Sequence, residues 1–460
     1  MIFSGYYGAD QYGVKYRGDD VETDAFVKWG NYLGSLNWNH RLSSRMFANT
    51  TLTYSRYRLD NDVRYFYDYE DEPEYFNSLY FSGIDDLGVK YGVDYLPGGG
   101  HSIKIGAMVT HHTYRPGALT YRYNIDNEKD DKDFSQNQLT SVETAFFAED
   151  DWELGRFKMN AGLHYSQFFT EGEFYHSLQP RLSLRYSLPG DWAVKASYAN
   201  MAQYINLLTS EALSLPTDLW VPSTDRIPPQ KSWQVALGLA NTLWQDFEFS
   251  VEGYYKEMQN VLSYKPGVSF IMDAASSIDW QDKITQGFGW SYGAEFLFQK
   301  KYGRTTGWLA YTLSWNDRRF DGINRGERFS FKYDRRHDFS AVLSHDLSKR
   351  WSFSGAWIYG TGNAFSLPDT YYDAPENMFG PQGYLVYSEK NNYRMSDYHR
   401  LDISFKRTKE KKWGETAWTF GAYNTYFRKN PFFVFQDLDR KLKEVTVLPV
   451  IPYFSWGFKF

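Results

Sequence analysis

Apolar and polar residues alternate along most of this chain with a period of two. Trp290, Tyr292 and Phe296 occupy alternate positions of one segment, and Ser291 and Glu295 lie between them. The same alternation occurs at residues 157–165, 192–198, 351–359 and 454–460. Because successive side chains of a β-strand point to opposite faces, this pattern predicts strands with one apolar and one polar face.

The composition narrows the class of protein. The chain has 460 residues, a mean hydropathy of -0.59 and no apolar run long enough for a membrane-spanning helix. Aromatic residues make up 20% of the chain, which suits the aromatic girdles of membrane β-barrels. A net charge of -6 argues against a nucleic-acid partner, and the lack of cysteine excludes disulfides and thiolate metal sites.

The lengths of the connections give the second constraint. We count about eighteen strands, joined by short and long connections in turn. The predicted short turns lie at or near 41–45, 97–100, 153–156, 188–191, 244–246, 300–304, 347–350 and 408–414. The predicted long loops cover roughly 10–28, 59–82, 115–140, 203–230, 263–286, 320–333, 361–398 and 428–445.

Such alternation is typical of an outer-membrane barrel, with short periplasmic turns and longer extracellular loops. A soluble β-sandwich has no reason to show it. A propeller should show a repeat of roughly 40–50 residues, and we find none. The sequence therefore predicts an all-β, transmembrane antiparallel β-barrel in which residues 1–460 form a single domain. Both chain ends are expected on the periplasmic side.

Five charged residues inside the predicted strands test this interpretation. A charge that faces lipid at mid-bilayer costs roughly 2–4 kcal/mol. We therefore expect these five side chains to point into the barrel, away from the face that carries Trp290 and Phe296. They are Lys158, Lys195, Glu252, Glu295 and Lys459.

Several segments, taken together, resemble a known family. They are LQPRLSLRY at 178–186, ASYANMAQY at 196–204, LPTDLWVP at 215–222, EGYYK at 252–256 and YDRRHD at 333–338. The chain is similar in these segments to the TonB-dependent receptors typical of Bacteroidota. The resemblance extends over nearly the whole chain and is strongest from about residue 180 to 338.

This resemblance implies a bacterial outer-membrane importer of a scarce ligand such as a siderophore, glycan or peptide. It implies a barrel of about 22 strands that is plugged by an N-terminal domain. We recognise neither a signal peptide nor the plug in this sequence, and we expect the first strands to be missing. Contact with the TonB complex is expected only through that N-terminal region. The other expected partners are membrane lipid, lipopolysaccharide, the barrel-assembly machinery and a surface lipoprotein.

Two sets of aromatic residues are candidate functional positions. Phe458 and Phe460 end the chain in the alternating pattern that the barrel-assembly machinery recognises, although Ser455 stands where a glycine is expected. The long loops are rich in rings, which suit sugars and other flat ligands. We predict a ligand entrance there, although loops that fold over a barrel mouth would also use such rings. Its candidate residues are Tyr65, Tyr67, Tyr69, Tyr371 and Tyr372.

Other motifs suggest chemistry that their context does not support. Residues 289–293 (GWSYG) match a nucleophile elbow, which requires a strand–turn–helix junction and not a strand interior. His111 and His112 are adjacent in a strand and cannot readily bind one metal ion, so we expect an interfacial or solvated pair. Residues 335–338 could contact an anionic ligand or lipopolysaccharide, and a plain salt network at the strand edge is at least an equal alternative.

The acidic tracts at 68–72 and 128–133 lack the ligand spacing of a calcium loop and are expected to be solvated loops. We therefore predict no cofactor and no enzymatic activity. Two other functions stay open, namely a passive porin or adhesin and, less favoured, an outer-membrane hydrolase.

Overall fold

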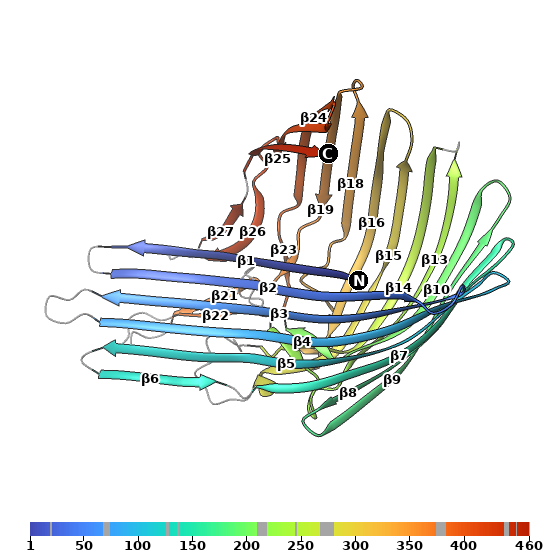
Figure 1. Cartoon of the computed structure of the whole chain (residues 1–460). Coiled ribbons are helices and arrows are strands. Elements are labelled where there is room, and N and C mark those ends of the chain that lie inside the picture. Colours follow the sequence, from blue (N-terminus) through green and yellow to red (C-terminus); the bar gives the residue numbers. More distant parts are fainter. Residues whose placement is uncertain are drawn as a thin grey trace. The chain divides into compact units, whose positions relative to one another are not determined.

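The computed structural model consists almost entirely of antiparallel β-strands (Figure 1). It describes the whole chain except residues 19–20, 68–73, 126–127, 136–137, 209–218, 244–245, 267–279, 374–382, 437–440, 448 and 460. Within these described ranges, neither of the helices is long or apolar enough to cross a membrane.

Twenty of the described strands belong to one sheet, and two of these, β6 and β17, are short additions beside β5 and β16. The other eighteen agree with the predicted number. Their bounds are β1 Ile2–Arg17, β2 Val21–Arg41, β3 Met46–Tyr67, β4 Glu74–Gly98, β5 His101–Ile125, β7 Leu139–Leu154, β8 Phe157–Thr170, β9 Glu173–Ser187, β10 Trp192–Gln203, β13 Gln230–Leu243, β14 Phe247–Tyr264, β15 Ile284–Lys300, β16 Thr305–Arg319, β18 His337–Asp346, β19 Trp351–Gly360, β24 Tyr398–Lys411, β25 Gly414–Tyr423 and β28 Ile451–Lys459.

The remaining elements lie in the connections between these long strands. They are β6 Glu128–Ser135, β11 Ile205–Leu208, β12 Leu219–Pro222, β17 Phe329–Ser330, β20 Ala364–Phe365, β21 Thr370–Asp373, β22 Gly383–Val386, β23 Tyr393–Arg394, β26 Asn430–Gln436 and β27 Leu442–Val447, with the short 3-10 helices η1 Trp280–Lys283 and η2 Asn324–Gly326.

Seven of the eight predicted short turns lie within the described residues, and each joins consecutive long strands of the sheet. The eighth, at 244–246, falls between β13 and β14 and lies partly outside the described residues. The turn between β9 and β10 shows why its residues are suited to this role. Gly190 has a φ of 73° and Asp191 a φ of 62°, in the left-handed region that glycine and aspartate tolerate best. Leu188 N–H donates to the Trp192 carbonyl at 2.7 Å and closes the turn.

The long connections differ from the prediction. Many of the residues that were expected in loops lie in paired strands. The expected loop at 10–28 is mostly a hairpin, in which Tyr16 pairs with Thr23. The expected loop at 59–82 contains the ends of β3 and β4, which pair as far as Tyr67 and Glu74. The tract at 128–133 is likewise not a loop, since it lies in β6 opposite β5. In these strand extensions, hydrogen bonds between paired strands satisfy the backbone N–H and C=O groups. The extensions therefore do not need the Gly, Pro, Asn and Asp residues that are typical of loops.

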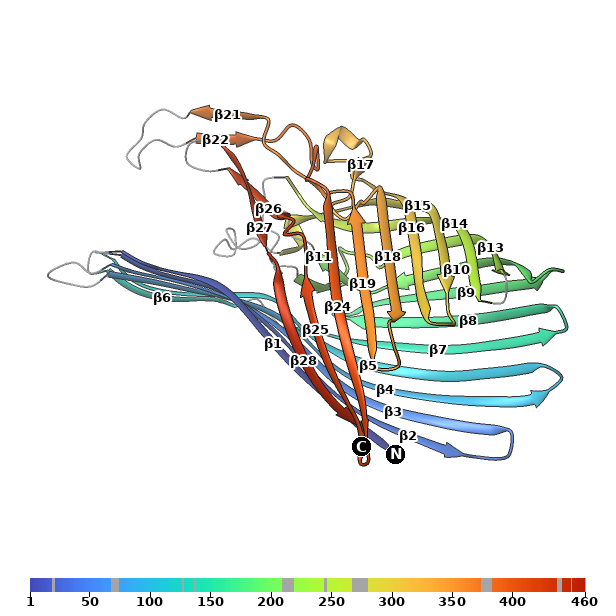
Figure 2. The ribbon, with the colours of Figure 1, turned by 90° about the horizontal axis from the view of Figure 1, so that it is seen from above.

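By its internal contacts the chain divides into two compact units, which are described separately below. The first unit comprises residues 1–183, 198–233 and 258–288, and the second comprises 184–197, 234–257 and 289–460. In the first unit, β1 to β5 lie side by side in chain order (Figure 1). In the second, β18, β19, β24 and β25 do the same (Figure 2).

Each sheet face in the second unit has its own chemistry. One face is apolar and exposed, and there the rings of Phe405, Phe420 and Phe454 follow one another across β24, β25 and β28. Trp418, Trp456 and Phe458 continue this apolar face. The other face carries polar groups.

Four of the five charged residues lie in the second unit, each on the face opposite to the exposed apolar side chains, as predicted. Glu295 alternates with the exposed Phe296, and Glu252 faces Gly238 while neighbouring Leu237 is 64% exposed on the other face. Strand alternation likewise puts Lys195 opposite to Val194, and Lys459 opposite to Phe458.

Lys158 fits the same pattern in the first unit. Its Nζ lies 3.5 Å from an Asp151 carboxylate oxygen on one face of β7 and β8. The rings of Trp152 and Phe157 contact each other on the opposite face.

Buried side chains of the first unit gather where two long connections pack on the polar face of the sheet. The cluster joins strands β4, β5 and β7 to the connections that contain β11, β12 and η1. Its members are Tyr80, Ile84, Tyr114, Leu139, Leu208, Val221, Ile227, Trp280 and Ile284. Burying one such aliphatic side chain contributes about 1.5–3 kcal/mol, so these connections are held firmly against the wall.

Candidate functional site

A cavity of about 740 Å³ lies in the first unit, between the polar face of the sheet and the connection after β10. β4 and β7 contribute Asp86 and Glu143 to its lining. The β11–β12 hairpin covers it with Leu207 and Trp220, which pair across that hairpin. The other lining residues are Asn31, Tyr57, Ile84, Ala202, Gln203, Tyr204 and Ile205. The cavity thus combines two carboxylates with several aromatic rings.

His112 lies behind the two carboxylates and is 4% exposed. Register puts it directly opposite Asp86 of β4 and Ser141 of β7. Its Nδ1 is 2.7 Å from Asp86 Oδ1, and its Nε2 is 3.7 Å from Glu143 Oε2. Because a buried polar group is costly unless it is paired, the hydrogen bond with His112 fixes Asp86 at the cavity wall, and Glu143 lies next to the same imidazole ring.

A second network fixes the aromatic part of the wall. Tyr204 stacks on the fully buried Phe168, with ring centroids 5.0 Å apart and an interplanar angle of 4°. The Tyr204 hydroxyl lies 2.7 Å from Ser166 Oγ, which also accepts a 2.7 Å hydrogen bond from Gln179 Nε2. The Tyr204 ring is therefore held in one orientation toward the cavity.

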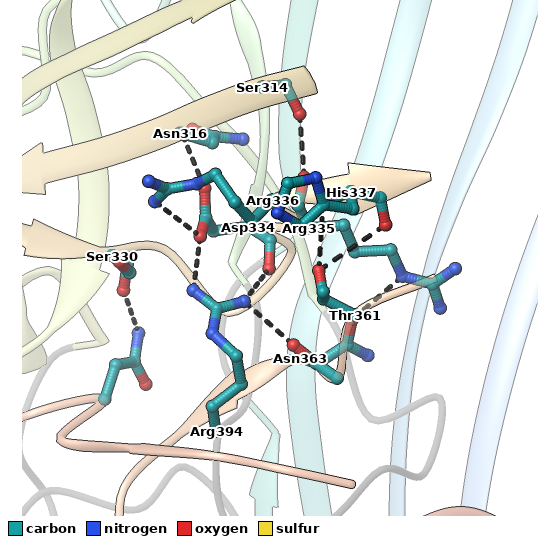
Figure 3. A network of polar contacts seen from close by, with 12 residues as sticks. Ser314, Asn316, Ser330, Asp334, Arg335, Arg336, His337, Thr361, Asn363 and Arg394 are labelled. Atoms are coloured by element: carbon teal, nitrogen blue, oxygen red, sulfur yellow. Dashed lines mark hydrogen bonds and ion pairs between the residues drawn. The ribbon is translucent and has the colours of Figure 1, made fainter. Parts of the chain in front are cut away.

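The second unit contains a different polar network, around the fully buried Asp334 (Figure 3). Arg394 Nη2 lies 2.5 Å from Asp334 Oδ2, and Arg394 Nη1 also donates to the Gly362 carbonyl at 2.8 Å. Asn316 N–H donates to Asp334 Oδ1 at 2.8 Å. Arg336 lies 3.5 Å from the same carboxylate. These contacts, with the Arg335–Asp338 pair at 3.7 Å, show a salt network at residues 335–338 that ties the 361–398 connection to β16. Contact of these residues with an anionic ligand or lipopolysaccharide stays a prediction.

The predicted entrance residues do not line this cavity. Tyr65, near the end of β3, contacts the Phe76 ring at 6.3 Å, and Tyr67 is the last residue of that strand. Tyr371 and Tyr372 lie in β21, paired with Leu385 and Tyr384. Tyr69 lies outside the described residues. Their role as an entrance stays a prediction.

Two other predictions concern single positions. Phe458 lies in β28 and is half exposed, with its ring centroid 5.2 Å from that of Trp456, and Phe460 lies outside the described residues. Ser291 lies inside β15 and not at a strand–turn–helix junction, so the GWSYG segment is no nucleophile elbow.

The sequence interpretation missed the cavity and misjudged one histidine. His111 and His112 do point to opposite faces, as expected, since they pair with Leu87 and Asp86 respectively. The expectation of an interfacial or solvated pair is wrong for His112, which is buried between two carboxylates. The available clue was that Asp86 and Glu143 interrupt apolar strands, where a charge requires a partner.

The fold and these faces define a class of protein. Long antiparallel strands with an exposed apolar face, joined by short and long connections in turn, make a transmembrane β-barrel of the bacterial outer membrane. The family described as TonB dependent receptor-like, beta-barrel matches residues 2–428. The chain belongs to this family.

Solved structures share the fold. The ferric-catecholate import receptor Fiu from E. coli K12 is 11% identical, with a TM-score of 0.56, and the match covers 96% of this chain and 65% of Fiu. The FrpB iron transporter from Neisseria meningitidis (F5-1 variant) is 9% identical, with a TM-score of 0.58 and coverage of 100% and 81%. BauA, the ferric preacinetobactin receptor from Acinetobacter baumannii, is 10% identical, with a TM-score of 0.57 and coverage of 100% and 73%.

The chain thus spans just under two thirds of the length of Fiu. No curated protein sequence matches it.

Proposed function

We propose that the chain forms the barrel of an active import receptor, and that residues 1–460 act as one barrel domain. Membership of the family supports this function. The cavity beside Asp86 and Glu143 would then be a binding position on the route of the ligand through the barrel. Coupling to TonB is assigned to an N-terminal region and not to the barrel wall.

The chemistry of the cavity narrows the ligand. Carboxylates repel anions, and a buried or half-buried carboxylate repels them more strongly than one in water. Hydroxyl and ammonium groups can donate to Asp86 and Glu143, while Tyr57, Tyr204 and Trp220 offer flat apolar surfaces. A glycan or a cationic peptide therefore fits this cavity better than an anionic iron complex. The ligands named for Fiu, FrpB and BauA belong to those proteins.

An uptake comparison tests this proposal in cells that make the natural protein. Labelled glycans, cationic peptides and ferric siderophores are offered to the parent strain, to a strain without the gene and to a strain without TonB. We expect uptake of one glycan or peptide class to be lost in both deletion strains. Uptake that persists without TonB would instead support the passive porin.

Variants of residues that line the cavity test whether the transported ligand binds there. Glu143→Gln and Trp220→Ala should raise the ligand concentration needed for half-maximal uptake about tenfold, because each removes a direct contact worth roughly 1–1.5 kcal/mol. His111→Gln is the matched control, since this exposed residue lies on the opposite face of β5. Unchanged uptake by both cavity variants would contradict the assignment of the cavity.

The predicted entrance is proposed as the first contact of the same ligand. Tyr65→Ala and Tyr67→Ala should slow uptake at low ligand concentration. An uptake rate equal to that of the natural protein would remove these residues from the route.

A further inference from the structure

One end of the apolar face in the second unit carries stacked aromatic rings. The ring centroid of Tyr292 in β15 lies 6.2 Å from that of Tyr255 in β14 and 5.3 Å from that of Trp315 in β16. The rings of Tyr292 and Trp315 are nearly parallel, with an interplanar angle of 8°. Alternation puts these rings on the same face as the exposed Phe296 and Leu309. Each ring lies eight to ten residues along its strand from the end at the short turn. Because a membrane-spanning strand needs about 9–11 residues, these rings lie near the extracellular interface of the membrane.

Two arginines cover this aromatic surface. Arg328 Cζ is 3.6 Å from the centroid of the Trp290 ring, and Arg336 Cζ is 4.5 Å from the Trp315 ring. A guanidinium group that lies over an aromatic ring can still donate from its N–H edges to other partners. We call these two arginines, together with Trp290, Tyr292 and Trp315, the arginine–aromatic patch.

Within the described residues, Arg328 has no carboxylate within ion-pair distance, so its guanidinium group can donate hydrogen bonds to an external partner. The carboxylate nearest to Arg336, that of Asp334, is shared with Arg394, which lies closer to it (Figure 3).

The local charge favours an anionic partner. Asp317 lies on the same face, where Tyr292 donates a hydrogen bond to it. Asp334 is the other carboxylate of the group, so three arginines, Arg328, Arg336 and Arg394, face two carboxylates. One positive charge remains at the interface, next to an apolar face.

We propose that the arginine–aromatic patch binds a phosphate of lipopolysaccharide in the outer leaflet. Guanidinium groups bind phosphate oxygens through paired hydrogen bonds, and these bonds strengthen near a low-dielectric surface. The rings below them would pack against the sugars and upper acyl chains that carry the phosphate. This site lies outside the barrel and is independent of the proposed transport function.

The opposite interface supplies a matched control. Arg407 Cζ lies 5.7 Å from the centroid of the Trp351 ring, close to the short turn between β18 and β19. This pair has the same chemistry, but it faces the periplasmic leaflet, which contains no lipopolysaccharide. A role of cation–aromatic stacking in stability alone would make both pairs behave alike.

The test is the amount of lipid A that remains bound to the full chain, measured by mass spectrometry after extraction from outer membranes in mild detergent. The double variant Arg328→Gln with Arg336→Gln should retain at least fivefold less lipid A than the natural protein. Arg407→Gln should retain the natural amount. The double Arg→Lys variant should keep an intermediate amount, because charge remains while the paired geometry is lost.

A second arm separates phosphate recognition from packing. The purified barrels are offered lipid A with and without its phosphates. Phosphorylated lipid A should bind the natural protein at least fivefold more tightly than the dephosphorylated form, and the double glutamine variant should show no preference. Equal retention by the natural protein and the glutamine variant, or equal binding of both lipid forms to the natural protein, would overturn the proposal. Resistance of each folded barrel to unfolding in detergent at room temperature confirms that all variants compared are folded.

Discussion

At the residue scale, His112 shows how strongly one buried position can depend on its neighbours. It lies between Asp86 and Glu143 on three adjacent strands, and its loss leaves both carboxylates without their cationic or hydrogen-bonding partner. We expect His112→Ala to lower the free energy of unfolding by about 2 kcal/mol.

Urea unfolding in detergent, followed by tryptophan fluorescence, measures this change. His111→Ala removes the same side chain from the exposed face of the same strand and should change stability by less than about 0.5 kcal/mol. Equal effects of the two variants would contradict the network.

Asp334 is the corresponding residue of the second unit. Asp334→Asn leaves Arg394 and Arg336 without a counter-charge, and should cost about 2–3 kcal/mol, less than a fully buried pair because Arg394 is partly exposed. Limited proteolysis should then cut the 361–398 connection faster. Asp338→Asn serves as the control, because its pair with Arg335 at 3.7 Å is exposed and should contribute less than about 1 kcal/mol.

The contact of Asp282 with Arg226 should make the stability of the connection between β14 and β15 depend on pH. The hydrogen bond from Arg226 lowers the pKa of Asp282, which lies in η1 outside the strands. Because the folded pKa is below the unfolded one, the contact stabilises the connection above about pH 4 and is lost as the pH falls through the folded pKa. Hydrogen exchange at residues 280–288, corrected for its intrinsic pH dependence, should be faster in Asp282→Asn than in the natural protein at pH 6. The difference should disappear in strong acid, and a difference that persists there would be evidence against the contact.

Residue identities alone could not predict these networks. Asp86, His112 and Glu143 are separated in sequence, and only the register of β4, β5 and β7 brings them together. A shift of one residue in either pairing would turn one of them to the lipid face. The sequence could show only that their charges need partners.

At the element scale, the two faces of β16 provide a direct comparison. Leu309 is 48% exposed on the apolar face, and neighbouring Ala310 points to the polar side. Leu309→Arg should cost about 2–4 kcal/mol, because it puts a charge into the lipid, whereas Ala310→Arg should cost less. The yield of folded barrel in outer membranes, judged by its altered gel mobility without heating, measures both. A larger loss for Ala310→Arg would reverse the assignment of the faces.

Strands and short turns were predictable because each leaves a local pattern. The alternation of apolar and polar residues with a period of two indicates a strand with two different faces. Pro189, Gly190 and Asp191 indicate a turn. The long connections were harder to predict, because the pairing of β1 with β2 and of β3 with β4 continues where the sequence loses its strict alternation. Beyond the membrane, both faces meet water or protein, and no lipid requires one of them to be apolar.

At the scale of the whole molecule, the sequence predicted the class of protein, while the cavity came only from the structure. The predicted sidedness stays a prediction. The segment ending in Tyr204 and the segment containing Trp220 carried the resemblance to the family, and the same residues line the cavity. Their function in the site was not visible from the sequence, because it depends on the packing of a connection against distant strands.

The proposed function requires a barrel that spans the outer membrane with its long connections outside. The chain contains no cysteine, so a single introduced cysteine reports one position without background. Gly322, in the connection after β16, is exposed and has open space for a side chain, and Tyr302, in the short turn before β16, is 63% exposed.

The decisive measurement is the labelling of Gly322→Cys and Tyr302→Cys in intact cells by a maleimide on a polymer too large to cross the outer membrane. We predict that Gly322→Cys is labelled in intact cells and that Tyr302→Cys is labelled only after the outer membrane is permeabilised. Equal labelling of both positions in intact cells, or labelling of Tyr302→Cys alone, would contradict this orientation of the barrel.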